Sequence, residues 1–399
     1  MIGGWFQFRE MKNKLRTIKN TKIEARRVVL RVDFNVPVKG GKVLDDYKIE
    51  RALPTINYLL KQKSKIVLIS HFGRPEGRRV SSLSLEPVYR VLKKKLKGTS
   101  VKFFSRPLTI GNHKLPDADV VVLENIRFDR REDGNKPTLA RTLAKLGEVF
   151  VNEAFATSHR ENASTVGITN FLPSFAGLNF ENEVNFLSKA LKPKQPAVAL
   201  IGGAKVETKF QVIKNFLKIY NKVMLGGGLA NTFLAAKGYD VGGSLFEPSE
   251  IGKAKRLLKS SKLILPVDVV VSGRNKQKVR VEKIGRQKKL CLREERILDI
   301  GPATIIRYAK YIRRAETIIW AGPLGLFEVP RFSHGTLALA KLIGARSSGR
   351  ALGIAGGGET LLAIHMSKMG RYYDFISTGG SAMLEFLEGK KLPGIAALE

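Results

Sequence analysis

Polar and cationic side chains follow four of the five strands predicted in the first half of the chain. Arginine forks and imidazole donors suit phosphate and carboxylate oxygens. Ligands of open parallel sheets sit at the carboxyl ends of the strands, so we expect these side chains to form one pocket for a small, multiply charged acid. The set is Asp33 and Asn35 in RVDFNVP, His71 and Arg74 in SHFGRP, Arg127 in LENIRF, and Arg160 in NEAFATSHREN.

Glycine takes the place of these cations at the strand ends of the second half. Glycine lets the backbone approach a ligand closely, and the first N–H groups of a helix favour an anion. Lys205 and Lys209 are four residues apart and share one helical face. Together these features predict a polyphosphate site. The stretches are GGAKVETK from Gly202, LGGGLANTF from Leu225, AGPLGLFE from Ala321 to Glu328, and GGGET from Gly356 to Thr360.

The last of these turns shows the local architecture most clearly. A short apolar run, Leu352 to Ala355, reads as a buried strand, and apolar residues recur at helical spacing after the three glycines. Taken alone, such a turn is equally compatible with an empty strand-to-helix connection. Lys205, Lys209 and Glu328, taken singly, fit a solvated surface better than a binding site. The phosphate interpretation therefore depends on the whole set.

The sequence contains no Walker A spacing, protein-kinase catalytic loop or nucleophilic triad. An acceptor carboxylate is already ionised at pH 7 and needs no general base before it attacks phosphorus. Positioning and charge neutralisation would then supply most of the catalysis. Both halves together are thus suited to phosphoryl transfer to a carboxylate.

Buried strand candidates alternate with helical segments, which predicts an α/β fold with parallel sheets and helical crossovers. Two series give two similar halves. The candidates are Arg27–Val32, Ile66–Ser70, Val101–Phe104, Val120–Leu123 and Val149–Asn152, followed by Ala197–Ile201, Lys222–Leu225, Leu263–Val270, Thr317–Trp320, Leu352–Ala355 and Phe375–Ser377.

One helix is expected between the halves, from Phe180 to Leu191, because its apolar residues fall on one face and Pro193 and Pro196 follow it. The charge-rich stretch Gly273–Arg296 interrupts the second half. We expect it to form a small hairpin or surface excursion.

Composition indicates a globular protein with anionic partners. The chain has 399 residues, 43% of them apolar and 26% charged, and is long enough for two domains. Its 70 Lys and Arg against 35 Asp and Glu give a formal charge of +35, which predicts binding of small phosphates or a polyanion.

The single cysteine, Cys291, allows no internal disulfide and no cysteine metal cluster, which fits a reducing cytosol. No segment approaches the roughly 18 uninterrupted apolar residues of a membrane span. We therefore expect a cytoplasmic protein without a membrane segment.

Eight sequence blocks occur in an order that closely resembles the phosphoglycerate kinase family: RVDFNVP, SHFGRP, LENIRF, GGAKVETK, GGGLANTF, GPLGLFE, GGGET and STGGSAMLEFLEG. The resemblance runs from Arg31 to Leu398. It implies two Rossmann-like parallel-sheet lobes joined by an interdomain helix, which close on each other for catalysis. It also implies reversible phosphoryl transfer between MgATP and the carboxylate of 3-phosphoglycerate, a step of glycolysis and gluconeogenesis, by a monomer.

With this resemblance the chain divides into five parts. They are a basic N-terminal extension (1–21), an N-terminal lobe that binds 3-phosphoglycerate (22–179), the interdomain helix and linker (180–196), a nucleotide-binding C-terminal lobe (197–378), and a C-terminal segment that returns to the N-terminal lobe (379–399).

Site residues follow from the resemblance position by position. The implied acid-binding residues are Asp33, Phe34, Asn35, Lys48, His71, Phe72, Gly73, Arg74, Arg127 and Arg160. The implied nucleotide-binding residues are Lys205, Lys209, Gly226, Gly227, Glu328, Gly356, Gly357, Gly358, Glu359 and Thr360. Lys48, Lys205 and Gly357 are the implied catalytic residues, and Glu359 is the implied ligand of Mg²⁺.

Three positions depart from the usual family pattern. Lys48 stands where the family normally has an arginine, which keeps the charge but loses the two-pronged geometry. Nearby Arg51 could compensate. Ala321 replaces an asparagine, and Glu359 replaces the usual aspartate metal ligand. A retuned catalytic rate is therefore expected.

Two other functions remain open from the sequence. The +35 charge and the three substitutions would also fit a nucleic-acid-binding protein on an inactive kinase scaffold. No RNA-reading aromatic motif or zinc module accompanies the charge. A kinase for another carboxylate is the second alternative, although the set of arginines favours an acceptor that carries its own phosphate.

Overall fold

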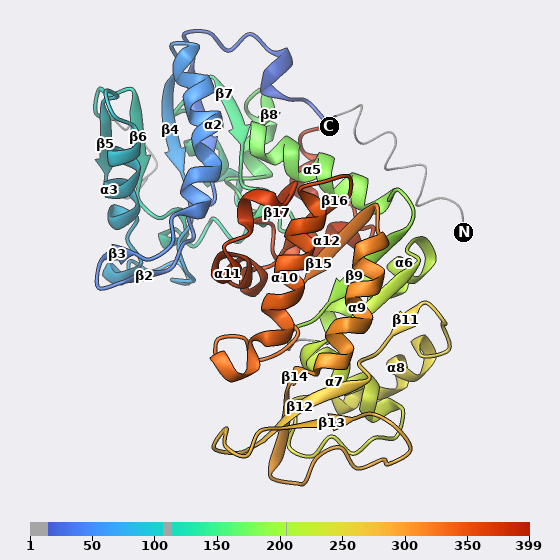
Figure 1. The fold of residues 1–399 in the computed structure, drawn as a ribbon. Coiled ribbons are helices and arrows are strands. Elements are labelled where there is room, and N and C mark those ends of the chain that lie inside the picture. Colours follow the sequence, from blue (N-terminus) through green and yellow to red (C-terminus); the bar gives the residue numbers. More distant parts are fainter. Residues whose placement is uncertain (1–14, 107–113, 205) are drawn as a thin grey trace. The chain divides into compact units, whose positions relative to one another are not determined.

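The computed structural model describes residues 15–106, 114–204 and 206–399 (Figure 1). The chain forms two compact units. Unit 1 extends to Asn185 and includes Gly389–Glu399, and unit 2 is Phe186–Glu388. Each unit is described by itself below.

Unit 1 contains a six-stranded parallel sheet in the order β5-β6-β4-β1-β7-β8. Its central strands are short runs of valine, isoleucine and leucine, as expected for strands that are covered on both faces. Their bounds are β1 (Arg27–Arg31), β4 (Lys65–Ile69), β5 (Val101–Phe104), β6 (Val120–Leu123), β7 (Val149–Asn152) and β8 (Ser174–Ala176). A two-stranded hairpin, β2 (Val38–Lys39) and β3 (Lys42–Val43), follows β1.

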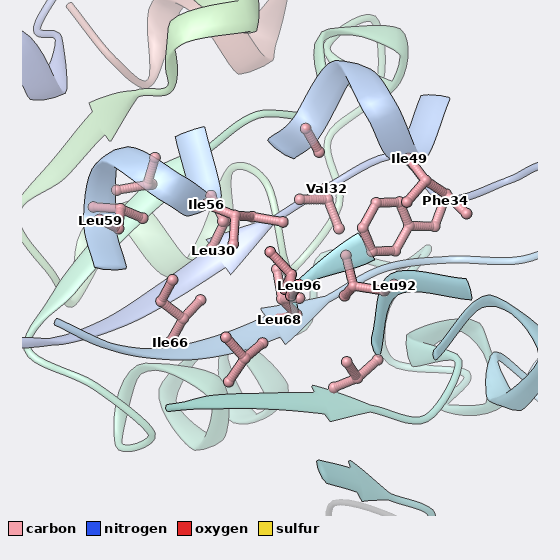
Figure 2. Close-up of a cluster of buried hydrophobic side chains, with 14 of the residues drawn as sticks. Leu30, Val32, Phe34, Ile49, Ile56, Leu59, Ile66, Leu68, Leu92 and Leu96 are labelled. Atoms are coloured by element: carbon pink, nitrogen blue, oxygen red, sulfur yellow. The ribbon is translucent and has the colours of Figure 1, made fainter. Parts of the chain in front are cut away.

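Helices cover both faces of this sheet. Figure 2 shows Leu30 of β1 and Leu68 of β4 in one apolar cluster with Ile56 and Leu59 of helix α2. The neighbouring residue Val29 points to the other face, because side chains alternate along a strand, and lies in a second cluster. The helices are α2 (Tyr47–Lys61), α3 (Glu86–Lys95), α4 (Pro137–Ala144) and, near the C-terminus, α13 (Pro393–Ala396).

Unit 2 contains a second six-stranded parallel sheet, in the order β11-β10-β9-β15-β16-β17. Its strands are β9 (Ala197–Ile201), β10 (Lys222–Leu225), β11 (Leu263–Ile264), β15 (Thr317–Ala321), β16 (Leu352–Gly356) and β17 (Phe375–Ser377). Its helices are α6 (Phe210–Ile219), α7 (Gly227–Ala236), α8 (Ile251–Leu257), α9 (Pro302–Arg314), α10 (His334–Ser347), α11 (Gly358–Ser367) and α12 (Ser381–Leu387). Two parallel sheets with helical crossovers confirm the predicted α/β class.

A separate antiparallel sheet, in the order β13-β12-β14, differs from the prediction of one strand at Leu263–Val270. That prediction is wrong because Pro266 lies between β11, in the parallel sheet, and β12 (Asp268–Gly273), in the antiparallel one. The predicted surface hairpin is confirmed: β12 pairs with β13 (Arg280–Lys283), and β14 (Glu295–Ile300) completes the sheet.

Helix α5 (Leu178–Leu191) starts two residues before the predicted helix, and the division between the units falls inside it. Glu153, which follows β7, accepts hydrogen bonds from the backbone N–H groups of Asn179 (3.0 Å) and Phe180 (3.1 Å) in the first turn of α5. A carboxylate at this end satisfies helix N–H groups that have no partner within the helix. The first turn of α5 is therefore fixed to the sheet of unit 1.

The C-terminal residues complete unit 1. Gly394 donates its backbone N–H to the carbonyl of Ser158, and Arg16 donates its own to the carbonyl of Leu398. The part of the chain that joins unit 1 starts at Gly389, ten residues after the start of the expected returning segment.

Candidate active site

Asp33 and Lys48 form the centre of the unit 1 candidate site. Asp33 follows β1, Lys48 lies in the first turn of α2, and Lys48 Nζ donates to Asp33 Oδ2 at 2.7 Å. Burial alone would raise the pKa of Asp33, but the charge of Lys48 and the hydrogen bonds from Lys48 and Asn35 outweigh it, and the pKa is lowered to about 2. Asp33 is therefore a fixed negative charge, and Lys48 is its partner.

The loop after β4 is attached to the loop after β1. Gly73 donates its N–H to Asn35 Oδ1 at 3.0 Å, and Phe34 donates its N–H to Ser70 Oγ at 2.9 Å. The Phe34 and Phe72 side chains are buried and anchor these loops in the core. Backbone contacts and buried rings thus hold both loops at the strand ends.

Arg127 belongs to the same cluster. It lies in the short 3₁₀ helix after β6, is 8% exposed, donates from Nη1 to the carbonyl of Gly73 at 3.0 Å, and pairs through Nε with Asp133 at 3.3 Å. A buried guanidinium with two fixed contacts is a pre-organised donor for an oxyanion.

The other predicted arginines of unit 1 are exposed. Arg160 donates from Nε to His159 Nε2 at 3.2 Å, and Arg74 follows Gly73 on the surface. The described contacts therefore connect Asp33, Asn35, Lys48, Gly73 and Arg127 directly, whereas Arg74 and Arg160 lie outside that network. Arg51 donates to Asn179 Oδ1 at 2.9 and 2.6 Å, so its fork is directed toward the start of α5.

Arg31 was missed by the sequence reasoning. It is the last residue of β1, is 1% exposed, and contacts His71 Nδ1 through Nη2 at 3.2 Å. The signal for it was a cation within an otherwise apolar strand, RVVLRV, where burial of an unpaired charge is very costly.

In unit 2 the glycine turns lie at the ends of neighbouring parallel strands β9, β15 and β16. Gly203, after β9, has a φ of +91°, and a Cβ added there would lie 2.6 Å from Lys209 Nζ and 3.6 Å from Glu359 Oε2. These two side chains from different elements therefore meet at one turn. Lys205 lies outside the described residues.

Lys209 is buried, and its Nζ donates to the carbonyl of Gly202. Burial lowers the pKa of Lys209 to about 8, although the charge of Glu359 acts in the opposite direction. The ammonium group is therefore still mostly charged at pH 7, and a negatively charged ligand nearby would stabilise it.

The start of α11 has the geometry predicted for an anion site. Gly357 precedes the helix with a φ of +105°, which favours glycine, and a Cβ at Gly358 would meet nothing within 4 Å. Thr360 is buried, and its Oγ1 accepts the N–H of Gly322 at 2.8 Å, which links this helix to the turn after β15. Exposed Glu359 lies between them in the first turn.

Two other predicted glycines have a packing reason for their lack of a side chain. A Cβ at Gly226, before α7, would meet Leu324 at 2.5 Å, and a Cβ at Gly356 would collide with Met383. Gly227 has a φ of +62°, and a Cβ there would lie 3.0 Å from Gly203 N. These glycines therefore bring the turns close together within unit 2.

Glu328 is exposed in the loop after β15. Leu245 was missed by the sequence reasoning: it is 59% exposed, and a Cβ at Gly228 would lie 3.3 Å from its Cδ2. This exposed leucine gives the glycine turn an apolar neighbour on the surface of unit 2. Buried Ala321 contributes through its carbonyl, which accepts the N–H of Gly202 at 3.0 Å.

Within the described ranges, no group of three or more His, Cys, Asp or Glu residues could hold a metal ion. No helix of the same ranges is both long and apolar enough to cross a membrane.

Each unit is an α/β unit with one parallel sheet; the strand ends have cations in unit 1 and glycines in unit 2. This combination is that of a two-unit phosphotransferase. A sequence model described as phosphoglycerate kinase matches residues 18–390. The chain belongs to the phosphoglycerate kinase family.

Similar proteins cover almost the whole chain. A phosphoglycerate kinase of Pelotomaculum thermopropionicum is 43% identical over 397 residues, which are 96% of this chain and 98% of that protein. A phosphoglycerate kinase of Chloroflexus aggregans is 42% identical over 401 residues, which are again 96% of this chain and 98% of that protein. The solved structure of phosphoglycerate kinase from Coxiella burnetii has a TM-score of 0.84 at 39% identity and covers 96% of this chain and 98% of its own.

Proposed function

We propose that this chain catalyses the reversible transfer of a phosphoryl group between MgATP and the carboxylate of 3-phosphoglycerate. One observation carries the proposal: a single chain of this family presents a cationic cluster at the strand ends of one sheet and a glycine-lined cluster with Lys209 and Glu359 at those of the other. The first matches a small phosphorylated acid, and the second matches a polyphosphate.

Unit 1 would bind the acid. Asp33 and Asn35 take its hydroxyl and neighbouring polar groups, and His71, Phe72 and Gly73 form the loop beside them. His71 and the arginines Arg74, Arg127 and Arg160 would hold the remote phosphate. Asp33 stays ionised with its lowered pKa and keeps Lys48 directed at the cluster.

Unit 2 would bind the nucleotide. The first turn of α11, from Gly357 to Thr360, directs N–H groups at the phosphates, and Lys209 neutralises the inner ones. Glu328 would take the ribose hydroxyls, and Leu245 would cover the base. From the sequence alone, Lys205 is assigned to the transferring phosphoryl group.

The residues present fit Mg²⁺ that arrives with the nucleotide. Mg²⁺ is usually bound by one or two carboxylates together with substrate phosphates and water rather than by an all-protein cage. Glu359 supplies one exposed carboxylate beside the glycine turns, which matches that donor set. When bound there, the ion would neutralise charge on the polyphosphate.

The chemistry requires no proton removal, because the acceptor carboxylate is already ionised. Lys48 would stabilise the charge of the transferring phosphoryl group, and Gly357 would offer its backbone without a side chain in the way. Both substrates must meet for transfer, so closure of the chain around them is part of the proposal. Closure would also exclude water as a competing acceptor.

The two alternatives from the sequence gain no support from the comparisons. Relatives over 96% of the chain carry the kinase name, and their names describe neither a nucleic-acid-binding protein nor a kinase for another carboxylate. A cytoplasmic, monomeric state and non-specific polyanion binding stay proposals.

Turnover of the purified protein in both directions, with saturating substrates and Mg²⁺, tests the proposal. A Lys205→Ala variant serves as the inactive control, and glycerate replaces 3-phosphoglycerate as the acceptor in a parallel assay. Turnover with 3-phosphoglycerate well above both comparisons is expected. Equal rates for wild type and Lys205→Ala would exclude the activity, and a preference for glycerate would favour another carboxylate kinase.

A further inference from the structure

Arg31 is a buried cation in which each of the three guanidinium nitrogens has a contact. Its Nε donates to Ser164 Oγ at 2.8 Å, its Nη1 donates to the carbonyl of Val32, and its Nη2 contacts His71 Nδ1 at 3.2 Å. It is 1% exposed and ends β1, so it has no room to reach a ligand itself.

A buried carboxylate is linked to this arginine through Ser164. Glu132 is 1% exposed, and its two oxygens accept the backbone N–H (2.9 Å) and the hydroxyl (2.6 Å) of Ser164. Burial lowers the pKa of Arg31, and the charge of Glu132 offsets part of that decrease. A guanidinium stays charged in proteins, and the Glu132 carboxylate balances the charge of Arg31. The contacts run from Glu132 through Ser164 and Arg31 to His71.

The contact between Arg31 and His71 fixes the position of a proton. Arginine has five N–H donors and no acceptor, so Nδ1 of His71 must accept and carries no hydrogen. The neutral imidazole then carries its proton on Nε2. Among the described residues, the imidazole has no other hydrogen bond, which leaves Nε2–H for a ligand.

The charges around His71 agree with a neutral ring. Burial lowers the pKa of His71 well below 6.5; the charge of Asp33 acts in the opposite direction, and those of Arg31, Arg127 and Lys48 lower it further. His71 is 5% exposed. It therefore meets its ligand as a neutral donor, and the arginines supply the charge.

We propose that Arg31 is a positioning residue for substrate binding: through its Nη2 contact with Nδ1, it holds His71 as the Nε2–H tautomer and directs that donor at the phosphate of 3-phosphoglycerate. The inference rests on the proposed function for the identity of the ligand. The tautomer itself is a property of the free protein and can be measured without substrate.

Long-range ¹H–¹⁵N correlation NMR on the ligand-free, full-length protein measures the tautomer directly, with His71→Gln to assign the signals. In the wild type we expect an unprotonated Nδ1 and a protonated Nε2 at every pH from 5 to 8. Protonation of Nδ1, or an imidazolium at pH 7, would overturn the proposal, whatever the activity of the enzyme.

The variant Arg31→Met alone would leave Glu132 buried without its counter-charge and would be destabilised, so it is paired with Glu132→Gln. The glutamine amide can donate to Ser164 Oγ in place of Arg31 Nε, while its oxygen still accepts the Ser164 N–H. In this double variant Nδ1 is free to bind a proton, and we expect His71 to titrate between pH 5 and 8. A ring that stays neutral there would contradict the proposal.

Steady-state kinetics at pH 8 provide the second measurement. We expect the double variant to have a KM for 3-phosphoglycerate about tenfold higher, with the kcat and the KM for ATP within about twofold. Arg90→Met, at an exposed arginine of α3, is the matched control. Equal changes in both KM values would indicate general damage and reject a positioning role. Absence of turnover in the wild type would reject the proposed function and leave the NMR result standing.

Discussion

At the scale of single residues, the candidate site departs from the usual family pattern at Lys48. Its ammonium group lies 2.7 Å from Asp33 Oδ2, and its side chain is 26% exposed, so a longer and forked side chain can be accommodated. Arg51 does not replace it, because the Arg51 fork already contacts Asn179. Lysine therefore provides charge without a second donor in a fixed direction.

We expect Lys48→Arg to keep or raise kcat, because arginine can contact Asp33 with one nitrogen and the transferring group with another. Lys48→Met should lower kcat by roughly 10²-fold, the usual effect of removing a charge that stabilises a transition state. Initial rates in both directions at saturating substrate measure this. A large loss in the arginine variant would mean that the site is adapted to lysine.

Lys209 shows how a binding residue can reduce stability. Its pKa in the folded protein, about 8, is below the usual 10.5, so the unfolded chain holds the proton more tightly. The stability cost is complete below pH 8 and disappears as the pH rises toward 10.5. We expect Lys209→Met to raise the free energy of unfolding at pH 7 by on the order of 1 to 3 kcal/mol and to weaken ATP binding.

Urea denaturation at pH 7 and pH 10, with and without ATP, measures this trade-off. The exposed lysine Lys214, in helix α6 directly after Lys209, provides the control variant Lys214→Met, for which little change is expected. A Lys209→Met protein that is less stable than wild type at pH 7 would show that the contact with Gly202 outweighs the cost of burying the charge.

At the scale of secondary-structure elements, the start of α5 depends on one buried carboxyl group. Glu153 accepts the N–H groups of Asn179 and Phe180 and the hydroxyl of Thr55 at 2.7 Å. Burial raises the pKa of Glu153 to about 7, and the hydrogen bonds from Thr55, Phe180 and Asn179 only partly offset that effect. The attachment of this helix to unit 1 is therefore coupled to pH.

The sign of the coupling follows from the raised pKa. Between about pH 4.5 and pH 7 the folded protein holds a proton on Glu153 that the unfolded chain has lost, so stability falls as the pH rises and levels off above 7. Glu153→Gln removes this contribution. We therefore expect the free energy of unfolding of this variant to fall less steeply with pH than that of the wild type, by up to about 1.4 kcal/mol per pH unit. Urea denaturation from pH 5 to pH 8 measures it.

The control for this experiment is Glu86→Gln, at an exposed carboxylate in the first turn of α3. Asp299 in unit 2 also has a pKa raised to about 7 by burial, so the wild-type slope contains more than one group and only the difference between variants is informative. Parallel profiles for wild type and Glu153→Gln would show that Glu153 does not titrate in this range.

At the scale of the whole molecule, the sequence predicted the α/β class because buried parallel strands are short apolar runs followed by polar or glycine-rich turns. It predicted the surface hairpin but joined β12 to β11 in one strand, because Val269 and Val270 continue the apolar run and only pairing with distant residues decides the sheet of β12. Asp33, Lys48 and Arg127 could be found as polar groups after strands or in motifs. Arg31 was missed because it lies within a strand rather than after one, and its contact with His71 is visible only in the structure.

The net charge of +35 also acts on the whole molecule, and its effect can be separated from catalysis. A dispersed basic surface should bind single-stranded RNA non-specifically, and log Kobs should fall linearly with log salt by somewhat less than one unit per contacted phosphate. Exposed charges are screened over about 8 Å at physiological salt, whereas the buried contacts of Arg127 and Lys209 are screened less. We therefore expect RNA binding to be lost between about 0.05 and 0.5 M KCl, while kcat changes little. Fluorescence titration of a labelled oligonucleotide and parallel rate measurements test this, and RNA affinity that is independent of salt would show a specific nucleic-acid site that the charge alone does not explain.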